Sequence, residues 1–137
     1  MNTFLGDKTS VVLQQTLTGL SRRQQVIGNN LANLNTPNFK ASEVVFESEL
    51  KRALDAQDQP DMLVKTHATH LAEDTQSVLS VEPIERAQKQ LTMRLDGNSV
   101  DVEREMASLA ETVLRFQSSA QVLSRKLAMW RSVITGR

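Results

Sequence analysis

Apolar residues recur at both ends of the chain in steps of four, three and four positions. This spacing is the a/d pattern of a heptad, whose period of about 3.5 residues keeps a narrow apolar stripe facing a partner helix. The pattern predicts one long helix at each end. At the N-terminal end the stripe consists of Leu13, Leu17, Leu20, Gln24, Ile27, Leu31 and Leu34. At the C-terminal end it consists of Val102, Met106, Leu109, Val113, Phe116, Ala120, Leu123, Leu127, Trp130 and Ile134.

We call these stripes the N-terminal seam and the C-terminal seam. Each is narrower than the apolar face of an ordinary surface helix, so each predicted helix requires a second helix to cover its seam. We therefore predict a mainly α-helical fold in which the two terminal helices pack as a coiled coil and form one domain. The predicted divisions are a first helix over 1–36, an irregular connector over 37–100 and a last helix over 101–137.

The first helix is predicted to begin among residues 7–10 and to continue to about Asn33. Short polar side chains among residues 7–10 can cap the free backbone amides at its start. Asn33 and Asn35 tolerate the left-handed conformation that ends helices, and Thr36 precedes Pro37, which favours an extended backbone. These signals together predict a definite end to the helix.

Two glycines, Gly19 and Gly28, lie inside the first predicted helix. A glycine within a helix costs up to about 1 kcal/mol relative to alanine, because its backbone loses more freedom on folding. We therefore expect each of the two to serve a close packing contact or a bend.

The last helix is predicted from its seam and from the order of charges along residues 102–135. Asp101, Glu103 and Glu105 stand at its start, where the helix dipole favours negative charge. The basic residues near its end are Arg125, Lys126 and Arg131. Neither Gly nor Pro interrupts the run, so we expect one unbroken rod that rises about 1.5 Å per residue.

The connector carries only local signals. A short amphipathic helix is predicted over 43–54, where apolar residues recur on one side. Residues 62–81 are predicted as loop or short extended pieces, with a strand-like alternation over 77–81. A brief helix is predicted over 83–95, before an Asp-Gly-Asn turn at 96–98.

Composition and charge exclude several classes of function. Aromatic residues make up 4% of the chain, so we expect no compact core built on large rings. The 16 basic and 16 acidic residues cancel, which argues against the positive field that nucleic-acid binding requires. The absence of cysteine excludes disulfides, thiolate nucleophiles and cysteine-based metal sites. The sequence lacks a membrane-spanning apolar stretch of about 18 residues and the profile of a cleaved signal peptide.

Candidate catalytic residues lack the context that catalysis needs. His67, His70 and Glu73 have a spacing that would gather metal ligands on a helix. The segment around them is not convincingly helical, and polar loop histidines are far commoner than ligands. No serine stands in a GxSxG elbow. We therefore expect no enzyme activity, no catalytic or metal residues, no cofactor and no small-molecule substrate.

Two motifs resemble those of the bacterial flagellar basal-body rod protein family. The first resembles the family's N-terminal signature, in which NN(I/L)AN is followed by TPG and an aromatic residue, and it consists of Asn29, Asn30, Asn33, Thr36, Pro37, Asn38 and Phe39. The second, within LDGNSVDVEREM, consists of Asp96, Gly97, Asn98, Val100 and Asp101. With the long last helix, it is most similar to the proximal rod members of the family. Asn38 stands where the family usually has glycine, and because Asn tolerates positive φ we expect the turn to survive.

The resemblance implies a structural subunit of the flagellar basal body that polymerises into the proximal rod, the drive shaft that crosses the periplasm. It also implies export, without a cleaved signal peptide, by the flagellar type III export apparatus. The implied partners are copies of itself, other rod proteins, the adaptor that joins the rod to the membrane ring, and the rod-capping protein. No nucleic acid is expected among them.

The residues of the first motif also predict a physical role. Asn29, Asn30 and Asn33 offer amide donors and acceptors near the end of the first helix, where backbone carbonyls lack intrahelical partners. An ordinary helix stop followed by a loop is the simplest alternative. Three asparagines within five residues are a poor choice for a stop alone. We predict that the motif orients the connector and contacts a neighbouring subunit.

Besides a self-assembling rod subunit, two other functions would explain part of the sequence pattern. A free-standing helical adaptor or chaperone that holds one partner helix would explain the seams, but not the asparagine-rich motif. A small metal-dependent enzyme built on His67, His70 and Glu73 would explain neither feature. Open-ended assembly grows with protein concentration whereas an adaptor stops at a fixed stoichiometry, so concentration separates the first two.

Overall fold

The computed structural model describes residues 7–58, 78, 81–88 and 95–136. The elements in chain order are α1 (Lys8–Ala32), β1 (Ser42–Val45), α2 (Glu47–Asp58), β2 (Ile84–Ala87) and α3 (Val102–Thr135). The predicted fold class is confirmed, because the protein is mainly helical and its two long terminal helices pack together. The connector contains a short helix and a small sheet, which agrees with the predicted mixture of helical and extended pieces.

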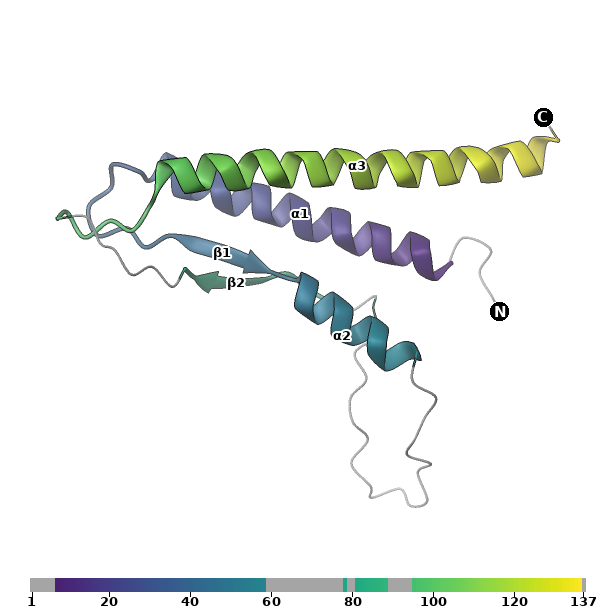
Figure 1. Ribbon diagram of the computed structural model, residues 1–137, viewed down its shortest axis with the longest axis horizontal. Coiled ribbons are helices and arrows are strands. Elements are labelled where there is room, and N and C mark those ends of the chain that lie inside the picture. Colours follow the sequence, from purple (N-terminus) through teal and green to yellow (C-terminus); the bar gives the residue numbers. More distant parts are fainter. Residues whose placement is uncertain (1–6, 59–77, 79–80, 89–94, 137) are drawn as a thin grey trace, which may run out of the picture.

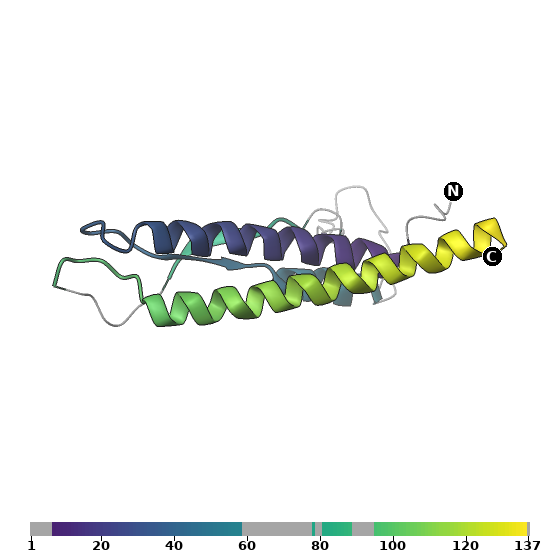
Figure 2. The ribbon, with the colours of Figure 1, turned by 90° about the horizontal axis from the view of Figure 1, so that it is seen from above.

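The two long helices lie side by side along the long axis of the molecule (Figures 1 and 2). The sheet and α2 lie on one side of this pair, and α1 contacts α3, β1 and α2. The C-terminal part of α3 continues beyond the start of α1 in both views. We call residues 127–135 the overhang, because Lys126 pairs with Asp7 immediately before α1 begins.

Both ends of α3 are capped. The Asp101 side chain caps the start by accepting from the backbone N–H groups of Glu103, at 3.1 Å, and Arg104, at 3.3 Å. At the other end Gly136 adopts the left-handed conformation with φ 67°, and its N–H donates to the carbonyl of Ser132 at 3.0 Å. The predicted unbroken rod is therefore present as one helix from cap to cap.

The sheet pairs β1 with β2 in antiparallel register, with Ser42 opposite Ala87 and Val45 opposite Ile84. It corrects two predictions, because helices had been expected to start at Glu43 and at Pro83. The β-branched pair at 44–45 favours an extended backbone, and pairing with a strand far along the chain overrides the local helical spacing at 84–87. Residues 62–77 and 79–80 of the predicted loop and strand-like stretch, and residues 89–94 of the second predicted helix, lie outside the described residues.

The core consists of two apolar clusters that share α1. The first joins Leu20 and Val26 of α1 to Val44 of β1 and to Phe46, and Phe116 of α3 packs against it. The second lies toward the start of α1 and covers the buried side of α2. Its members and the apolar residues packed against them are Leu50, Ala53, Val78, Val81, Val11, Val12 and Leu54. Helix α1 is therefore buried on two sides, one toward α3 and one toward β1 and α2.

Gly19 lies where α1 passes closest to Phe46. A Cβ atom placed on Gly19 would lie 2.5 Å from the ring of Phe46, which is itself 3% exposed. The expected packing role therefore holds for Gly19, since only a residue without a side chain leaves room for the ring. Gly28 is exposed, and a Cβ atom there would meet no atom within 4 Å, so the same expectation fails for Gly28 within one subunit.

Candidate assembly site

Asn98 joins the end of α1 to the loop that precedes α3. Its side chain is 0% exposed. The Nδ2 group donates to the backbone carbonyls of Asn33, Leu34 and Thr36, each at 2.9 Å. The Oδ1 atom accepts from the backbone N–H of Val100 at 2.7 Å. Asn98 therefore holds Asn33, the C-cap residue of α1, and the turn that follows it, from a position 65 residues after Asn33.

Two residues with positive φ shape the backbone beside this contact. Asn38 has φ 60° and Gly97 has φ 75°. The N–H of Asn38 donates to the carbonyl of Asp96 at 2.9 Å, and Lys40 Nζ donates to the carbonyl of Gly97 at 2.9 Å. A Cβ atom on Gly97 would collide with the Asn38 side chain. The predicted turn at 96–98 is present, and asparagine sustains the left-handed conformation at position 38 as expected.

Asn30 links α1 to β1 and α3 at a fully buried position. Its Oδ1 accepts from the N–H of Ser42 at 3.0 Å, while its Nδ2 donates to the carbonyl of Ser42 at 2.8 Å and to Glu105 Oε2 at 3.1 Å. Glu105 is 2% exposed and also accepts from Gln88 Nε2 at 3.3 Å. The amide of Asn30 thus pairs with a β-strand as a backbone would, and it holds the start of α3 against the end of α1.

The structure brings the two sequence motifs together, although with roles divided differently from the expectation. Asn33 Nδ2 donates to the carbonyl of Asn29 at 2.9 Å, within the end of α1. Asn30 bonds to β1 and α3 instead, and Asn98 of the second motif bonds to the carbonyls of the turn that follows α1. Pro37 is exposed, whereas Phe39 is half-buried.

Glu105 was missed as a site residue, because its position at a helix start was attributed to the helix dipole. Its spacing carried a further signal. Glu105 precedes Thr112 and Phe116 by seven and eleven positions, so the three share one face of α3, and Glu105 and Thr112 are 2% exposed.

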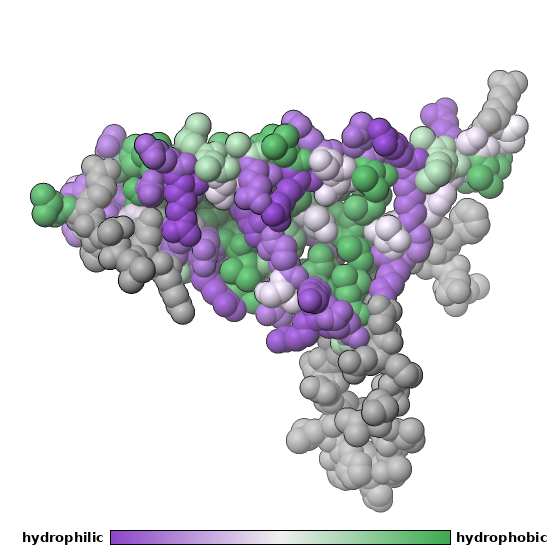
Figure 3. Space-filling view, viewed as in Figure 1, coloured by the Kyte–Doolittle hydropathy of each residue, from purple (hydrophilic) through white to green (hydrophobic). Residues whose placement is uncertain are grey.

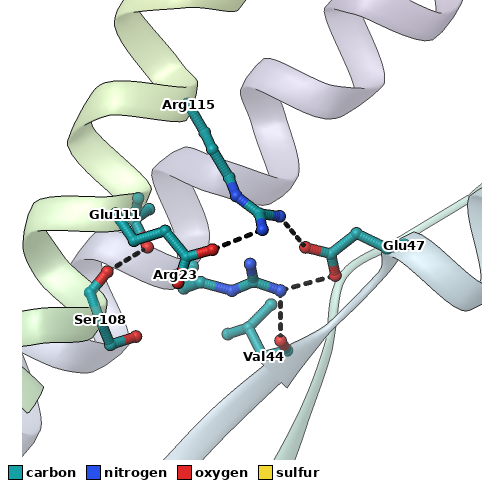
Figure 4. A network of polar contacts seen from close by, with 7 residues as sticks. Arg23, Val44, Glu47, Ser108, Glu111 and Arg115 are labelled. Carbon is teal, nitrogen blue, oxygen red and sulfur yellow. Dashed lines mark hydrogen bonds and ion pairs between the residues drawn. The ribbon is translucent and has the colours of Figure 1, made fainter. Parts of the chain in front are cut away.

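An ion-pair network around Glu47 ties α1, α2 and α3 together (Figure 4). Arg23 Nη2 lies 2.6 Å from Glu47 Oε2 and donates to the carbonyl of Val44 at 3.0 Å. Arg115 Nη1 lies 3.8 Å from Glu47 Oε1, and the same guanidinium pairs with Glu111. The carboxylate at the start of α2 is therefore shared by cations from both long helices.

Two carboxyl groups in these contacts are held in their ionised form. Partial burial raises the pKa of Glu47, but the hydrogen bond from Arg23 and the amides at the start of α2 outweigh burial, and the net pKa is lowered. The hydrogen bond from Lys126 lowers the pKa of Asp7. Both groups therefore favour the folded state in their charged forms.

Acid is expected to weaken the protein through these two groups. Because both folded-state pKa values are lowered, their contribution to the free energy of unfolding is complete above the ordinary values of 3.8 and 4.5 and is lost as pH falls below them. We expect Glu47→Gln to show a smaller loss of stability between about pH 7 and pH 3 than the wild type. Urea unfolding at the two pH values measures this difference. Equal losses in both proteins would contradict the assignment to Glu47.

The seams are covered unevenly within one subunit. In the N-terminal seam Leu20 and Ile27 are buried, and the half-buried residues are Leu13, Leu17, Gln24, Leu31 and Leu34. In the C-terminal seam the half-buried residues are Leu109, Val113, Phe116, Ala120, Leu123 and Trp130. Its exposed residues are Val102, Met106, Leu127 and Ile134. The face of α3 that packs against α1 is therefore rotated from the predicted seam, and one edge of that seam is left open.

Comparison with known proteins places these features in a family. A family model for flagella basal body rod proteins matches residues 12–40, which cover most of α1 and the first motif. FlgB of Bacillus subtilis, a flagellar basal body rod protein, is 32% identical over 125 residues, which are 90% of this chain and 91% of that protein. The chain belongs to the FlgB family of flagellar basal body rod proteins.

Other FlgB proteins match over similar lengths. FlgB of Yersinia enterocolitica is 31% identical over 124 residues, covering 88% of this chain and 89% of that protein. FlgB of Salmonella typhimurium is 30% identical over 126 residues, covering 90% of each. The motifs in the sequence had favoured the FlgB type over the similarly sized FlgC type, and the resemblance to FlgB is confirmed.

Membership of the FlgB family makes this chain a structural rod protein of the flagellar basal body and not an enzyme. Among the helices that the structure describes, none combines the length and apolar character that crossing a bilayer requires. In the same part of the chain no three His, Asp or Glu side chains gather as metal ligands. His67, His70 and Glu73 lie outside the described residues.

Proposed function

We propose that this FlgB-family protein is a subunit of the proximal rod that assembles by packing its terminal helices against copies of itself and other rod proteins. In this role it helps to form the drive shaft that transmits torque across the periplasm. The proposal rests mainly on the open edge of the C-terminal seam. Val102, Met106, Leu127 and Ile134 are 39%, 53%, 50% and 73% exposed. A heptad pattern whose apolar residues remain in solvent within one subunit is explained by a helix from another subunit.

The energetics favour assembly over a stable isolated surface. Burying one large aliphatic side chain contributes about 1.5 to 3 kcal/mol relative to full exposure. Helices gain most of their stability from packing rather than from intrinsic propensity. Covering the open edge of the seam in a neighbour would therefore stabilise α3 beyond its contacts with α1, and folding of the chain ends would be coupled to assembly.

The two motifs are proposed to set the geometry of each subunit during assembly. Asn98 and Asn30 hold the end of α1, the start of α3 and β1 in one buried hydrogen-bonded unit. Buried and fully bonded polar groups specify a single arrangement, since any displacement leaves them unpaired. On this proposal the helical segments 1–36 and 101–137 form one domain, joined by the connector 37–100, and residues of the turn around Pro37 contact a neighbouring subunit.

The finer partners and location belong to the same proposal. The rod subunit would contact the adaptor that joins the rod to the membrane ring and the rod-capping protein. It would reach the periplasm through the flagellar type III export apparatus, without cleavage of a signal peptide. The names of the FlgB relatives support the basal body as the place of action.

An adaptor or chaperone that binds one partner helix is the alternative, and concentration distinguishes it. We expect the average mass in sedimentation velocity to keep rising with protein concentration. Replacing both Leu127 and Ile134 by Asp is expected to weaken this assembly at least about tenfold, because a charge would be buried without a partner. Gln121→Asp, on the opposite side of α3, is the matched control and should assemble normally. A fixed small complex, or normal assembly of the double variant, would contradict the proposal.

A further inference from the structure

A second apolar surface, separate from the seam, lies between α2 and α3. It is a hollow of about 520 Å³ whose apolar lining is formed by Leu20, Phe46, Leu50, Leu54 and Leu114. Glu47, Lys51, Asp55 and Arg115 stand at its rim. Figure 3 shows the hydrophobic surface at this place, with hydrophilic residues around it. We call this hollow the α2–α3 groove.

The groove has the form of a helix-binding site. Leu50 and Leu54, one helical turn apart on α2, both line the groove and so place a row of two apolar side chains along it. Leu114, on the facing helix, is 65% exposed. An amphipathic helix of about two turns places its apolar row in such a groove and keeps its charged sides at the rim.

The chain itself carries a helix of that description, in the overhang. Leu127, Trp130 and Ile134 follow steps of three and four and therefore form one apolar row about two turns long. Val133, beside them, is 76% exposed. The overhang has no α1 beside it (Figures 1 and 2), and in its apolar row Leu127 and Ile134 are 50% and 73% exposed, whereas Trp130 is half-buried.

Charge is complementary between the two surfaces. Helix α2 contains the four carboxylates of its sequence ESELKRALDAQD against two basic residues. The overhang contains one charged residue, the exposed Arg131, and no acidic residue. At the rim Glu47 is paired with Arg23 and Arg115. The exposed Asp55 is therefore the carboxylate that would meet Arg131. Such a pair favours encounter and fixes orientation more than it adds affinity.

The overhang cannot reach the groove of its own chain. Leu114 and Ile134 lie twenty residues apart on one continuous helix, a separation of about 30 Å. Contact between the two surfaces therefore requires two molecules. Because the surfaces differ, each copy that offers its overhang still has a free groove, and such contacts repeat into an open chain instead of closing as a pair.

We infer that the overhang of one copy docks in the α2–α3 groove of a second copy. This inference rests on the proposed rod function and names a contact through which the rod subunits join. It assigns the groove to assembly in addition to the seam. It also brings Arg131 of the overhang together with Asp55 of α2 in one contact.

Disulfide trapping tests the pairing in the full chain, which contains no native cysteine. One sample carries Leu114→Cys, and a second sample, enlarged by a tag, carries Ile134→Cys. In the control mixture, Leu95→Cys takes the place of Leu114→Cys; Leu95 is an exposed residue at the far end of the molecule. We expect the test mixture to form a disulfide-linked heterodimer about tenfold faster than the control mixture. A rate equal to the control, or a dominant link between two copies of Ile134→Cys, would overturn the pairing.

Charge reversal provides an independent check in the same trapping assay. Asp55→Lys and Arg131→Glu are each expected to lower the heterodimer yield, by about tenfold at low salt, and combining one variant of each kind should restore it. Absence of restoration would count against this docking. Growth of large assemblies without the heterodimer would overturn the docking and leave the rod function in place, whereas a fixed small stoichiometry would contradict the rod function itself.

Discussion

Asn98→Asp is expected to lower the free energy of unfolding by about 3 kcal/mol. The substitution keeps the shape of the side chain but replaces the Nδ2 donor by an oxygen. The three carbonyls of Asn33, Leu34 and Thr36 would then face an acceptor at a position that is 0% exposed. Urea unfolding followed by circular dichroism measures the change.

The control for this variant is Asn35→Asp, which introduces the same charge on an exposed residue of the same turn. Its free energy of unfolding is expected to stay within about 0.5 kcal/mol of the wild type. Lowering the pH should partly restore the Asn98→Asp variant, since a protonated carboxyl group again donates a hydrogen bond. If the two variants were equally stable, Asn98 could not hold the turn after α1 as described.

Gly19→Ala is expected to lower the free energy of unfolding by about 2 kcal/mol, although alanine is the better helix former. The new methyl group would lie 2.5 Å from the Phe46 ring, which is enclosed by Leu20, Val26 and Val44. The ring or α1 must therefore move. Thermal and urea unfolding of the variant at neutral pH give the size of the effect.

Gly28→Ala is the matched control in the same helix, and its effect should have the opposite sign. No atom lies within 4 Å of the added methyl group, so only the helix propensity changes, and a gain of about 0.5 to 1 kcal/mol is expected. A stabilising effect of Gly19→Ala would mean that Phe46 does not pack against α1 as described.

The long helices were the part of the fold that could be predicted from the sequence, because their signals are local. The seam period, the acidic residues at its start and the run without Gly or Pro predict α3 over the residues that it occupies. The left-handed residue at position 38 was predicted for the same reason, since φ preference belongs to the residue itself.

The sheet and the division of roles within the turn were not predicted, because they depend on contacts between distant parts of the chain. Ile84 and its neighbours have a helical spacing, and their strand conformation comes from pairing with β1, about forty residues earlier. Asn98 reaches the carbonyls of the turn after α1 from as far as 65 positions along the chain. Local propensity contains no information on which distant groups will meet.

The rotation of α3 away from its predicted seam has the same origin. The first cluster draws Phe116 toward β1 and Phe46, and Asn30 holds Glu105 at the start of the helix. The heptad pattern identified a face that must be covered, but it could not divide that face between a partner in the same chain and a partner in another. The open edge of the seam therefore became visible only in the three-dimensional structure.

The pair of long helices is fastened differently at its two ends. The motif end is closed by buried hydrogen bonds from Asn98 and Asn30, whereas at the overhang end Lys126 meets Asp7, whose side chain is 49% exposed. A bending load on the tip of α3 will consequently separate the helices progressively from the Asp7 side, and the motif end will yield last. Mechanical compliance and structural precision are thus located at opposite ends of one subunit.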